Sequence, residues 1–205
     1  EAVAAPASTE ADLWQRAAEV YATYAGRYRS RFKWLGAHLF SPQLAGDLQQ
    51  DAASLRRVLA RNSPWRPEDD TKLQALLQLV TGAHAGEKVI VFTQFADTVR
   101  YLERCLRERG VQQVAGASGS SADPTLLAWR FSPESNEIRD RIGPADELQV
   151  LICTDVLSEG QNLQDGYIVV NYDLPWAIIR LIQRAGRVDR IGQKAEEILC
   201  YSFLP

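Results

Sequence analysis

The sequence lacks several features that would each mark a particular class of protein. It contains no methionine and only three cysteines, Cys105, Cys153 and Cys200, which lie far apart. Three cysteines are too few, and odd in number, for the disulfide framework of a secreted domain. They favour a location in the reducing cytoplasm. No apolar run reaches the roughly 18 residues of a membrane span. No secretory signal is visible at the N-terminus, so neither a membrane nor a secretory pathway is expected.

Neither sign of charge dominates the chain. Its 205 residues include 23 Lys and Arg against 26 Asp and Glu, a net charge of −3. The chain is therefore not a generally cationic coat for nucleic acid, and any nucleic-acid surface must be a local patch. A hydrophobic fraction of 46% excludes a disordered or collagen-like protein. Because no initiating methionine precedes the Ala-rich opening, we expect a piece of a longer protein that carries part of its activity.

The first third of the sequence is helical in pattern. Apolar residues recur at helical spacing from about 12 to 59, with a second helix expected near 44–59. Residues 62–67 hold two prolines and predict a turn or linker. We therefore divide the chain into a helical N-terminal segment with its linker, 1–65, and a second domain, 66–205.

The second domain alternates between strands and helices. A helix is expected to begin after Asp70, and the apolar runs at 89–92 and 150–153 are typical of strands buried on both faces. Three more strands are expected, at 111–114, 167–171 and 198–203. Three more helices are expected, at 95–110, 123–131 and 176–186. Residues 132–147 are interpreted as a loop. This alternation predicts an α/β fold, a doubly wound parallel sheet covered by helices on both faces.

The loops after the expected strands carry unusual polar residues. In such folds ligands bind at the carboxyl ends of the strands, where Thr93 and Gln94, the loop 154–163 and the segment 183–193 are placed. Five cations recur near the last segment at steps of four, three, three and four: Arg180, Arg184, Arg187, Arg190 and Lys194. On one helix these would form a cationic stripe suited to phosphate. Gly186 is expected to end or distort that helix, which would turn the later cations away. The alternative is a solvated helix face on which Asp189 pairs locally.

Three motifs give these loops a family resemblance. They are Val89-Ile-Val-Phe-Thr-Gln-Phe95, Thr154-Asp-(x)4-Gly-x-Asn162 and Gln183-x-x-Gly-Arg-x-x-Arg190. In this order they resemble motifs of superfamily 2 helicases and translocases, and the ending Arg190-Ile-Gly-Gln193 resembles the Snf-type branch, which includes bacterial members. The resemblance covers about 70–205 and implies the second, C-terminal RecA-like lobe.

The resemblance implies roles around a nucleotide. Arg187 and Arg190 would reach across a cleft to the phosphates of ATP bound on the other lobe, as arginine fingers. Gln183 would orient these two arginines. Gly186 would let the backbone turn without a Cβ clash.

The loop that begins at Thr154 adds further implied contacts. Gly160 would bring backbone close to the ribose, Asn162 would supply polar contacts, and Glu159 would couple the nucleotide to nucleic acid. The plainer alternatives are a tight turn at Gly160 and a turn-forming side chain at Asn162.

The other implied partner is nucleic acid, expected to be DNA. Thr93, Gln94 and Thr154 match positions that hold phosphates through hydroxyl, amide and backbone donors. Trp176 matches a position near the nucleic-acid groove. The alternatives are a strand-end helix cap for Thr154 with Asp155, and a core position for Trp176.

Two motifs of the complete motor are missing. No Gly-x-x-x-x-Gly-Lys-[Ser/Thr] phosphate loop occurs, nor any Gly-Lys dipeptide. The run Asp146-Glu-Leu-Gln149 begins like the family's acidic Mg²⁺ motif but precedes a strand, and we interpret it as loop acids. Because both motifs belong to the first lobe, ATP and Mg²⁺ would be bound only by the two-lobe enzyme. The chain is expected to be monomeric, inactive alone and without a metal site.

Two other functions remain open on sequence. One is a non-catalytic module on the same fold that binds nucleic acid or protein, and the other is a small-molecule-binding α/β domain. The segment Arg27–Trp34 interleaves cations with aromatics, as single-strand binding needs. We favour a helix end there, with the aromatic rings packed inward. His38 and His84 are isolated and are assigned no role.

Overall fold

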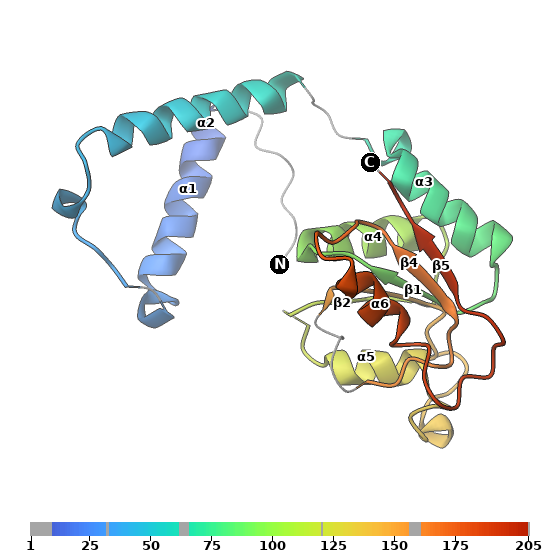
Figure 1. The fold of residues 1–205 in the computed structure, drawn as a ribbon. Helices are drawn as coiled ribbons and strands as arrows, with labels where there is room; N and C mark the ends of the chain where they lie inside the picture. Colours follow the sequence, from blue (N-terminus) through green and yellow to red (C-terminus); the bar gives the residue numbers. More distant parts are fainter. Residues whose placement is uncertain (1–9, 32, 62–65, 120, 156–160, 205) are drawn as a thin grey trace. The chain divides into compact units, whose positions relative to one another are not determined.

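The computed structural model describes residues 10–31, 33–61, 66–119, 121–155 and 161–204 (Figure 1). The chain divides into two compact units, Glu1–Ser63 and Pro64–Pro205. None of the described helices is long and apolar enough to cross a membrane.

The first unit holds two helices, α1 (Glu10–Ala25) and α2 (Leu44–Arg61). Short 3₁₀ turns at Arg29–Arg31 and Ala37–Leu39 lie between them. No described side chain of this unit is buried, so apolar residues such as Leu55 remain exposed. The described part of this unit therefore has no buried core.

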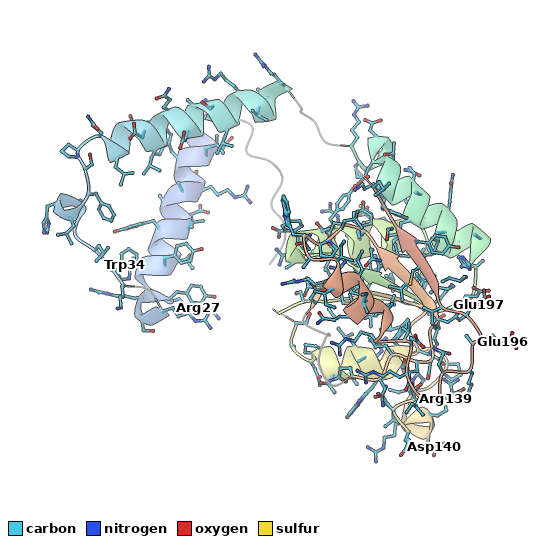
Figure 2. All side chains as sticks on the ribbon, viewed as in Figure 1. Arg27, Trp34, Arg139, Asp140, Glu196 and Glu197 are labelled. Carbon is cyan, nitrogen blue, oxygen red and sulfur yellow. The ribbon has the colours of Figure 1, made fainter. Side chains whose placement is uncertain are left out.

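The mixed cationic and aromatic segment lies on the turns after α1, where Figure 2 labels Arg27 and Trp34. The guanidinium groups of Arg27 and Arg31 each lie 5.5 Å from the ring centroid of Tyr28. Trp34 packs edge-on against Tyr21, with ring centroids 5.8 Å apart, yet is 46% exposed. Tyr28 is half-buried and Trp34 is exposed, so the expected inward packing is incomplete for these two rings. Phe32 lies outside the described residues.

The second unit opens with the helix expected after Asp70. The Asp70 carboxylate accepts a hydrogen bond from the Leu73 N–H at 3.0 Å and caps α3 (Thr71–Gln78). The chain continues as one π-helical turn, Leu79–Ala83. Apolar residues on one side of this segment are buried against the sheet.

Five strands form a parallel sheet in the order β2-β3-β1-β4-β5 (Figure 1). Their bounds are β1 Val89–Phe92, β2 Val114–Ala117, β3 Val150–Cys153, β4 Ile168–Asn171 and β5 Leu199–Ser202. The second strand begins at Val114, where the expected strand at 111–114 ends, so its expected position is three residues too early. Gly110 adopts φ +92° and the Val111 N–H bonds back to the Leu106 carbonyl, so these residues end a helix instead.

Alternate residues of the central strands enter two separate cores. Val89 and Val91 face a core with α3 and α4 (Ala96–Glu108), whereas Ile90 and Phe92 face a core with α5 (Pro124–Phe131). All four of these β1 residues are fully buried. The predicted doubly wound parallel sheet with helices on both faces is confirmed.

The carboxyl ends of the strands meet at one edge of the sheet. β1 and β4 are neighbours in register, with Phe92 opposite Asn171. The chain leaves β1 toward the β2 edge and leaves β4 toward β5. Such a reversal of direction is where open α/β sheets bind ligands.

Two connections differ from their sequence interpretation. The loop 132–147 contains a 3₁₀ turn, Arg139–Arg141. The helix expected at 176–186 is shorter, since α6 spans only Ile179–Ala185. Glu147 lies in the loop before β3, where its carboxylate accepts hydrogen bonds from Lys88 at 2.6 Å and from Arg139.

Candidate functional site

The five cations expected along one helix face do not form a stripe. Because α6 ends at Ala185 and Gly186 follows as its cap, Arg187, Arg190 and Lys194 lie beyond the helix. Lys194 forms an ion pair with a loop residue, Glu134. The helix therefore ends at its Gly186 cap, as expected, and the five cations have separate environments instead of one shared helix face.

Arg184 is a buried anchor between α6 and the sheet. Its side chain is 2% exposed, and its Nε donates to the Asp155 carboxylate at 2.9 Å. Its Nη1 donates to the Asn171 side chain at 3.1 Å and to the Asp173 carbonyl at 3.2 Å. The guanidinium also lies 5.3 Å from the centroid of the Phe92 ring. Arg184 thus joins the ends of three strands and has no exposed face for a ligand.

Asp155 binds a second arginine from the same helix. The exposed Arg180 donates from Nη1 to the Asp155 carboxylate at 3.1 Å. The preceding residue, Thr154, is half-buried, and its N–H donates to the Ala117 carbonyl at 3.0 Å. The end of β3 is therefore tied both to the neighbouring strand β2 and to α6.

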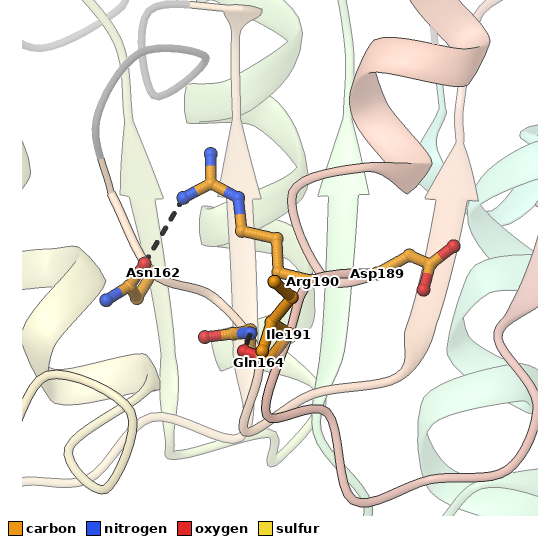
Figure 3. Close-up of a pocket in the computed structure, with 5 residues that line it drawn as sticks. All are labelled: Asn162, Gln164, Asp189, Arg190 and Ile191. Atoms are coloured by element: carbon orange, nitrogen blue, oxygen red, sulfur yellow. Dashed lines mark hydrogen bonds between the residues drawn. The ribbon is translucent and has the colours of Figure 1, made fainter.

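Arg190 and Asn162, predicted from separate motifs, come together. The Arg190 Nη1 donates to the Asn162 side-chain oxygen at 3.2 Å, and Nε donates to the Gly186 carbonyl at 3.4 Å. Figure 3 shows this contact at the rim of a surface hollow of about 630 Å³. The hollow is lined by Asn162, Gln164, Asp189, Arg190 and Ile191.

Asn162 is itself fixed by the loop after α5. Its side-chain amide donates to the Ser135 carbonyl at 3.1 Å, and its own carbonyl accepts from the Asn136 side chain at 2.8 Å. These contacts leave the side-chain oxygen of Asn162 for Arg190. Glu159 and Gly160, the other implied nucleotide contacts of this loop, lie outside the described residues.

The remaining implied nucleotide contacts flank the end of α6. Gln183 is exposed on the helix, and Arg187 is half-buried directly after Gly186. Gly186 has φ −64°, so it does not use a conformation that only glycine favours. A Cβ there would lie 3.2 Å from the Ile182 carbonyl oxygen, a tight contact for any larger residue.

The implied phosphate donors after β1 are held within the protein. Thr93 is fully buried, and its hydroxyl donates to the Asp173 carboxylate. The backbone N–H of Gln94 lies 3.0 Å from both Asp173 carboxylate oxygens, and its side-chain amide donates to the Leu174 carbonyl at 3.1 Å. In this structure Asp173 therefore accepts from two of the donors that the resemblance assigned to nucleic acid, the Thr93 hydroxyl and the Gln94 N–H.

Trp176 lies on the surface rather than in the core. Its side chain is 101% exposed, and Ile178 and Ile182 on the same segment are 74% and 63% exposed. The core alternative for Trp176 is therefore wrong. Exposed apolar side chains gathered on one segment often mark an interaction surface.

The surroundings shift the pKa values of two groups near the sheet, Cys153 and Glu147. Burial raises the pKa of the Cys153 thiol, which suits a small hydrophobe at the end of β3 rather than a nucleophile. Burial opposes ionisation of Glu147, but hydrogen bonds from Lys88 and Arg139 outweigh it and lower the pKa of that carboxyl. Within the described part of the chain, no group of three His, Cys, Asp or Glu could hold a metal ion.

Sequence reasoning missed several residues that organise this edge. Asp173 and Asn171 end or follow β4, and the rule that parallel strands share one carboxyl edge would have marked them. Gln193 was noted only as the end of the Arg190-Ile-Gly-Gln193 run, and Gln164 not at all, because each contacts backbone carbonyls that only the fold brings together.

Comparison with known proteins shows the family to which this chain is similar. Residues 71–192 match the family model described as "Helicase conserved C-terminal domain", which covers more than half of the chain. The "Uncharacterized ATP-dependent helicase YqhH" of Bacillus subtilis is 34% identical over 110 residues, 54% of this chain and 18% of the relative. The "RNA polymerase-associated protein RapA" of Vibrio cholerae is 38% identical over 129 residues, 62% of this chain and 12% of the relative.

A solved structure shares the fold. The C-terminal part of the Fun30 ATPase domain superposes with a TM-score of 0.52 at 19% identity, over 76% of this chain and 48% of that one. The chain spans less than a fifth of the length of the two curated relatives.

Proposed function

The chain belongs to the helicase conserved C-terminal domain family, and we propose that it is the second motor lobe of an ATP-dependent translocase or helicase of the Snf-type branch. Its substrate in the complete enzyme is ATP, and its polymer is nucleic acid, which we take to be DNA. The similarity to a protein named as an ATP-dependent helicase supports this proposal.

The contact between Arg190 and Asn162 is the observation that carries the proposal. A guanidinium group at the rim of a hollow, held by a side-chain oxygen at 3.2 Å, is oriented before any ligand arrives. A planar, permanently charged group suits phosphate oxygens because it offers several donors in a fixed plane. A pure binding module has no need of arginines at the spacing of Arg187 and Arg190.

Arg187 and Arg190 act on charge that builds during phosphoryl transfer. The leaving phosphates gain negative charge in the transition state, and donors positioned beforehand stabilise that charge more than they stabilise bound ATP. In the proposed enzyme the other lobe binds the phosphates and this lobe supplies the two guanidinium groups. Gln183, on the exposed side of α6, lies close in sequence to both arginines and completes the proposed nucleotide face.

Magnesium is not assigned to this chain. The described residues offer no group of carboxylates that fits the ion. Glu147, in the run that begins like the acidic motif, is already bound to Lys88 and Arg139. The Mg²⁺ that neutralises ATP would be held by the other lobe.

We propose that nucleic acid lies along a different part of the carboxyl edge from the proposed nucleotide face, at Thr154, Gln94 and Trp176. Thr154 is half-buried directly after β3, and Gln94 is half-buried in the turn between β1 and α4. Trp176, in the segment that leads from β4 to α6, presents its full ring to solvent. Engagement of Thr93 and the Gln94 N–H by a phosphate would require Asp173 to release them.

The proposal is tested by ATP turnover of the full-length protein with saturating nucleic acid. Arg187→Ala should lower kcat by roughly 10³-fold or more, the effect of losing an arginine finger. Arg104→Ala is the matched control, because Arg104 is an exposed arginine on α4 whose ion-pair partner is Glu108. Turnover that survives Arg187→Ala, or that falls equally with Arg104→Ala, would favour the non-catalytic binding module.

A further inference from the structure

The ending Arg190-Ile-Gly-Gln193 forms a tight turn whose shape is set by its last two residues. The Gln193 N–H donates to the Arg190 carbonyl at 3.0 Å, and Gly192 adopts φ +99°. A positive φ at the third residue is the requirement of a type II turn and favours glycine. The turn restrains the local backbone at Arg190. Other contacts must hold the turn in place on the domain.

The side chain of Gln193 attaches this turn to the body of the lobe. Its amide nitrogen lies 2.9 Å from the Val188 carbonyl oxygen and 3.1 Å from the carbonyl oxygens of both Gln164 and Gly166. Its side-chain oxygen accepts from the Ala195 N–H at 2.9 Å. One side chain thus joins the segment before Arg190 to the turn that precedes β4.

The Gln164 side chain also bonds to the turn, from the segment that Gln193 contacts. Its side-chain amide donates to the Ile191 carbonyl at 2.8 Å, and Figure 3 shows Gln164 beside Ile191 while Arg190 reaches Asn162. The backbone on both sides of Arg190 is therefore held by two glutamines. We call Gln164 and Gln193 the glutamine clamp.

The clamp lies between two buried anchors. Val188 and Leu163 are each fully buried in the same core. Arg190 follows one anchor by two residues, and Asn162 directly precedes the other. The clamp therefore joins the two backbone segments that carry Arg190 and Asn162, whose side chains lie within hydrogen-bond distance at 3.2 Å.

We propose that Gln193, supported by Gln164, is a positioning residue that sets the reach of Arg190 toward the transferred phosphate. This inference rests on the proposed function of Arg190. Neither glutamine needs to touch ATP. A displacement of about 1 Å at a catalytic group can cost on the order of 10²-fold in rate, so loss of the clamp should act on chemistry rather than on binding.

The test is a double-mutant cycle in the full-length protein, read as ATP turnover with saturating nucleic acid. Gln193→Met keeps the length of the side chain and removes the amide. It should lower kcat about 10- to 100-fold while KM for ATP changes less than about threefold, the pattern of an interaction lost in the transition state. In the Arg190→Ala background the same change should cost nothing further, because the group it positions is gone.

Two further variants distinguish a loss of positioning from a loss of folding. Gln164→Met removes only the bond to Ile191 and should reproduce the kcat loss in milder form. Gln113→Met is the matched control, since Gln113 also donates its amide to a carbonyl, that of Pro144, far from Arg190 in sequence. Thermal melts show whether each variant is folded, and Gln164→Met decides the question if Gln193→Met is not.

The outcomes separate the inference from the proposed function. If Gln193→Met lowers kcat by the same factor with and without Arg190, or does not lower it at all, the clamp does not act through Arg190. If Arg190→Ala alone leaves turnover unchanged, the proposed function of that arginine fails, and the inference fails with it.

Discussion

Arg184 and Asp155 form an ion pair across the carboxyl edge of the sheet. The Arg184 Nε and Nη2 atoms lie 2.9 and 3.5 Å from the two carboxylate oxygens, and the arginine side chain is 2% exposed. A buried charge that loses its partner is costly, because water cannot replace the lost bonds.

The pair therefore predicts a loss of stability. Asp155→Ala should lower the free energy of unfolding of the chain by about 3 kcal/mol, because it leaves the positively charged Arg184 guanidinium buried without its carboxylate partner. Denaturant titration measures the change. Arg180→Met is the control: this second partner of Asp155 is 53% exposed, and its removal should cost less than about 1 kcal/mol. Equal losses in the two variants would mean that Arg184 is not an anchor.

Glu147 predicts a pH dependence. Burial would raise the pKa of its carboxyl, but hydrogen bonds from Lys88 and Arg139 lower it below the ordinary 4.5. A carboxyl whose pKa falls on folding adds stability above the unfolded pKa, and that stability is lost as pH drops through the folded pKa. Between pH 7 and pH 3, wild type should lose more unfolding free energy than Glu147→Gln. Parallel stability curves for the two proteins would refute the pairing.

The chain alone should not hydrolyse ATP. It contains no phosphate loop, and the arginines that we assign to catalysis act on phosphates held elsewhere. Phosphate release from the purified 205-residue chain should stay at background with or without DNA. Turnover above background that Arg187→Ala abolishes would show that the chain holds a complete site.

Nucleic acid should bind the chain weakly and without sequence preference. With net charge −3 and contacts from one lobe, we expect a dissociation constant no tighter than roughly 10⁻⁶–10⁻⁴ M near physiological salt. Fluorescence anisotropy across a salt series would report the constant and its slope. Tight, sequence-specific binding that persists at high salt would support the binding-module alternative.

The sheet was largely predictable from sequence because β-branched runs such as 89–92 and 150–153 are buried on both faces. β2 was misplaced because the residues after Gly110 are apolar enough for a strand but complete a helix end. The second strand instead contains Ala115 and Gly116, small residues that carry little strand signal.

The candidate site was only partly predictable. The family resemblance implied that Arg190 and Asn162 lie at one nucleotide site, and in the structure a hydrogen bond joins their side chains. Helical spacing cannot say which side of a short helix faces the sheet, so Arg184 was grouped with exposed cations although it is buried. The contacts of the glutamine clamp could not be predicted from the sequence. Their acceptors are backbone carbonyls, which every residue has, so no residue type marks them.

The central claim is that Arg190 faces ATP whereas Thr154 faces nucleic acid. The most direct test measures turnover and nucleic-acid affinity for Arg190→Ala and Thr154→Ala in the full-length protein. Arg190→Ala should lower turnover roughly 10³-fold with little change in nucleic-acid affinity. Thr154→Ala should weaken nucleic-acid stimulation before ATP binding, since it removes one phosphate contact. If Arg190→Ala mainly weakens nucleic-acid binding while turnover at saturating nucleic acid stays near wild type, Arg190 lies on the nucleic-acid surface and the account is wrong.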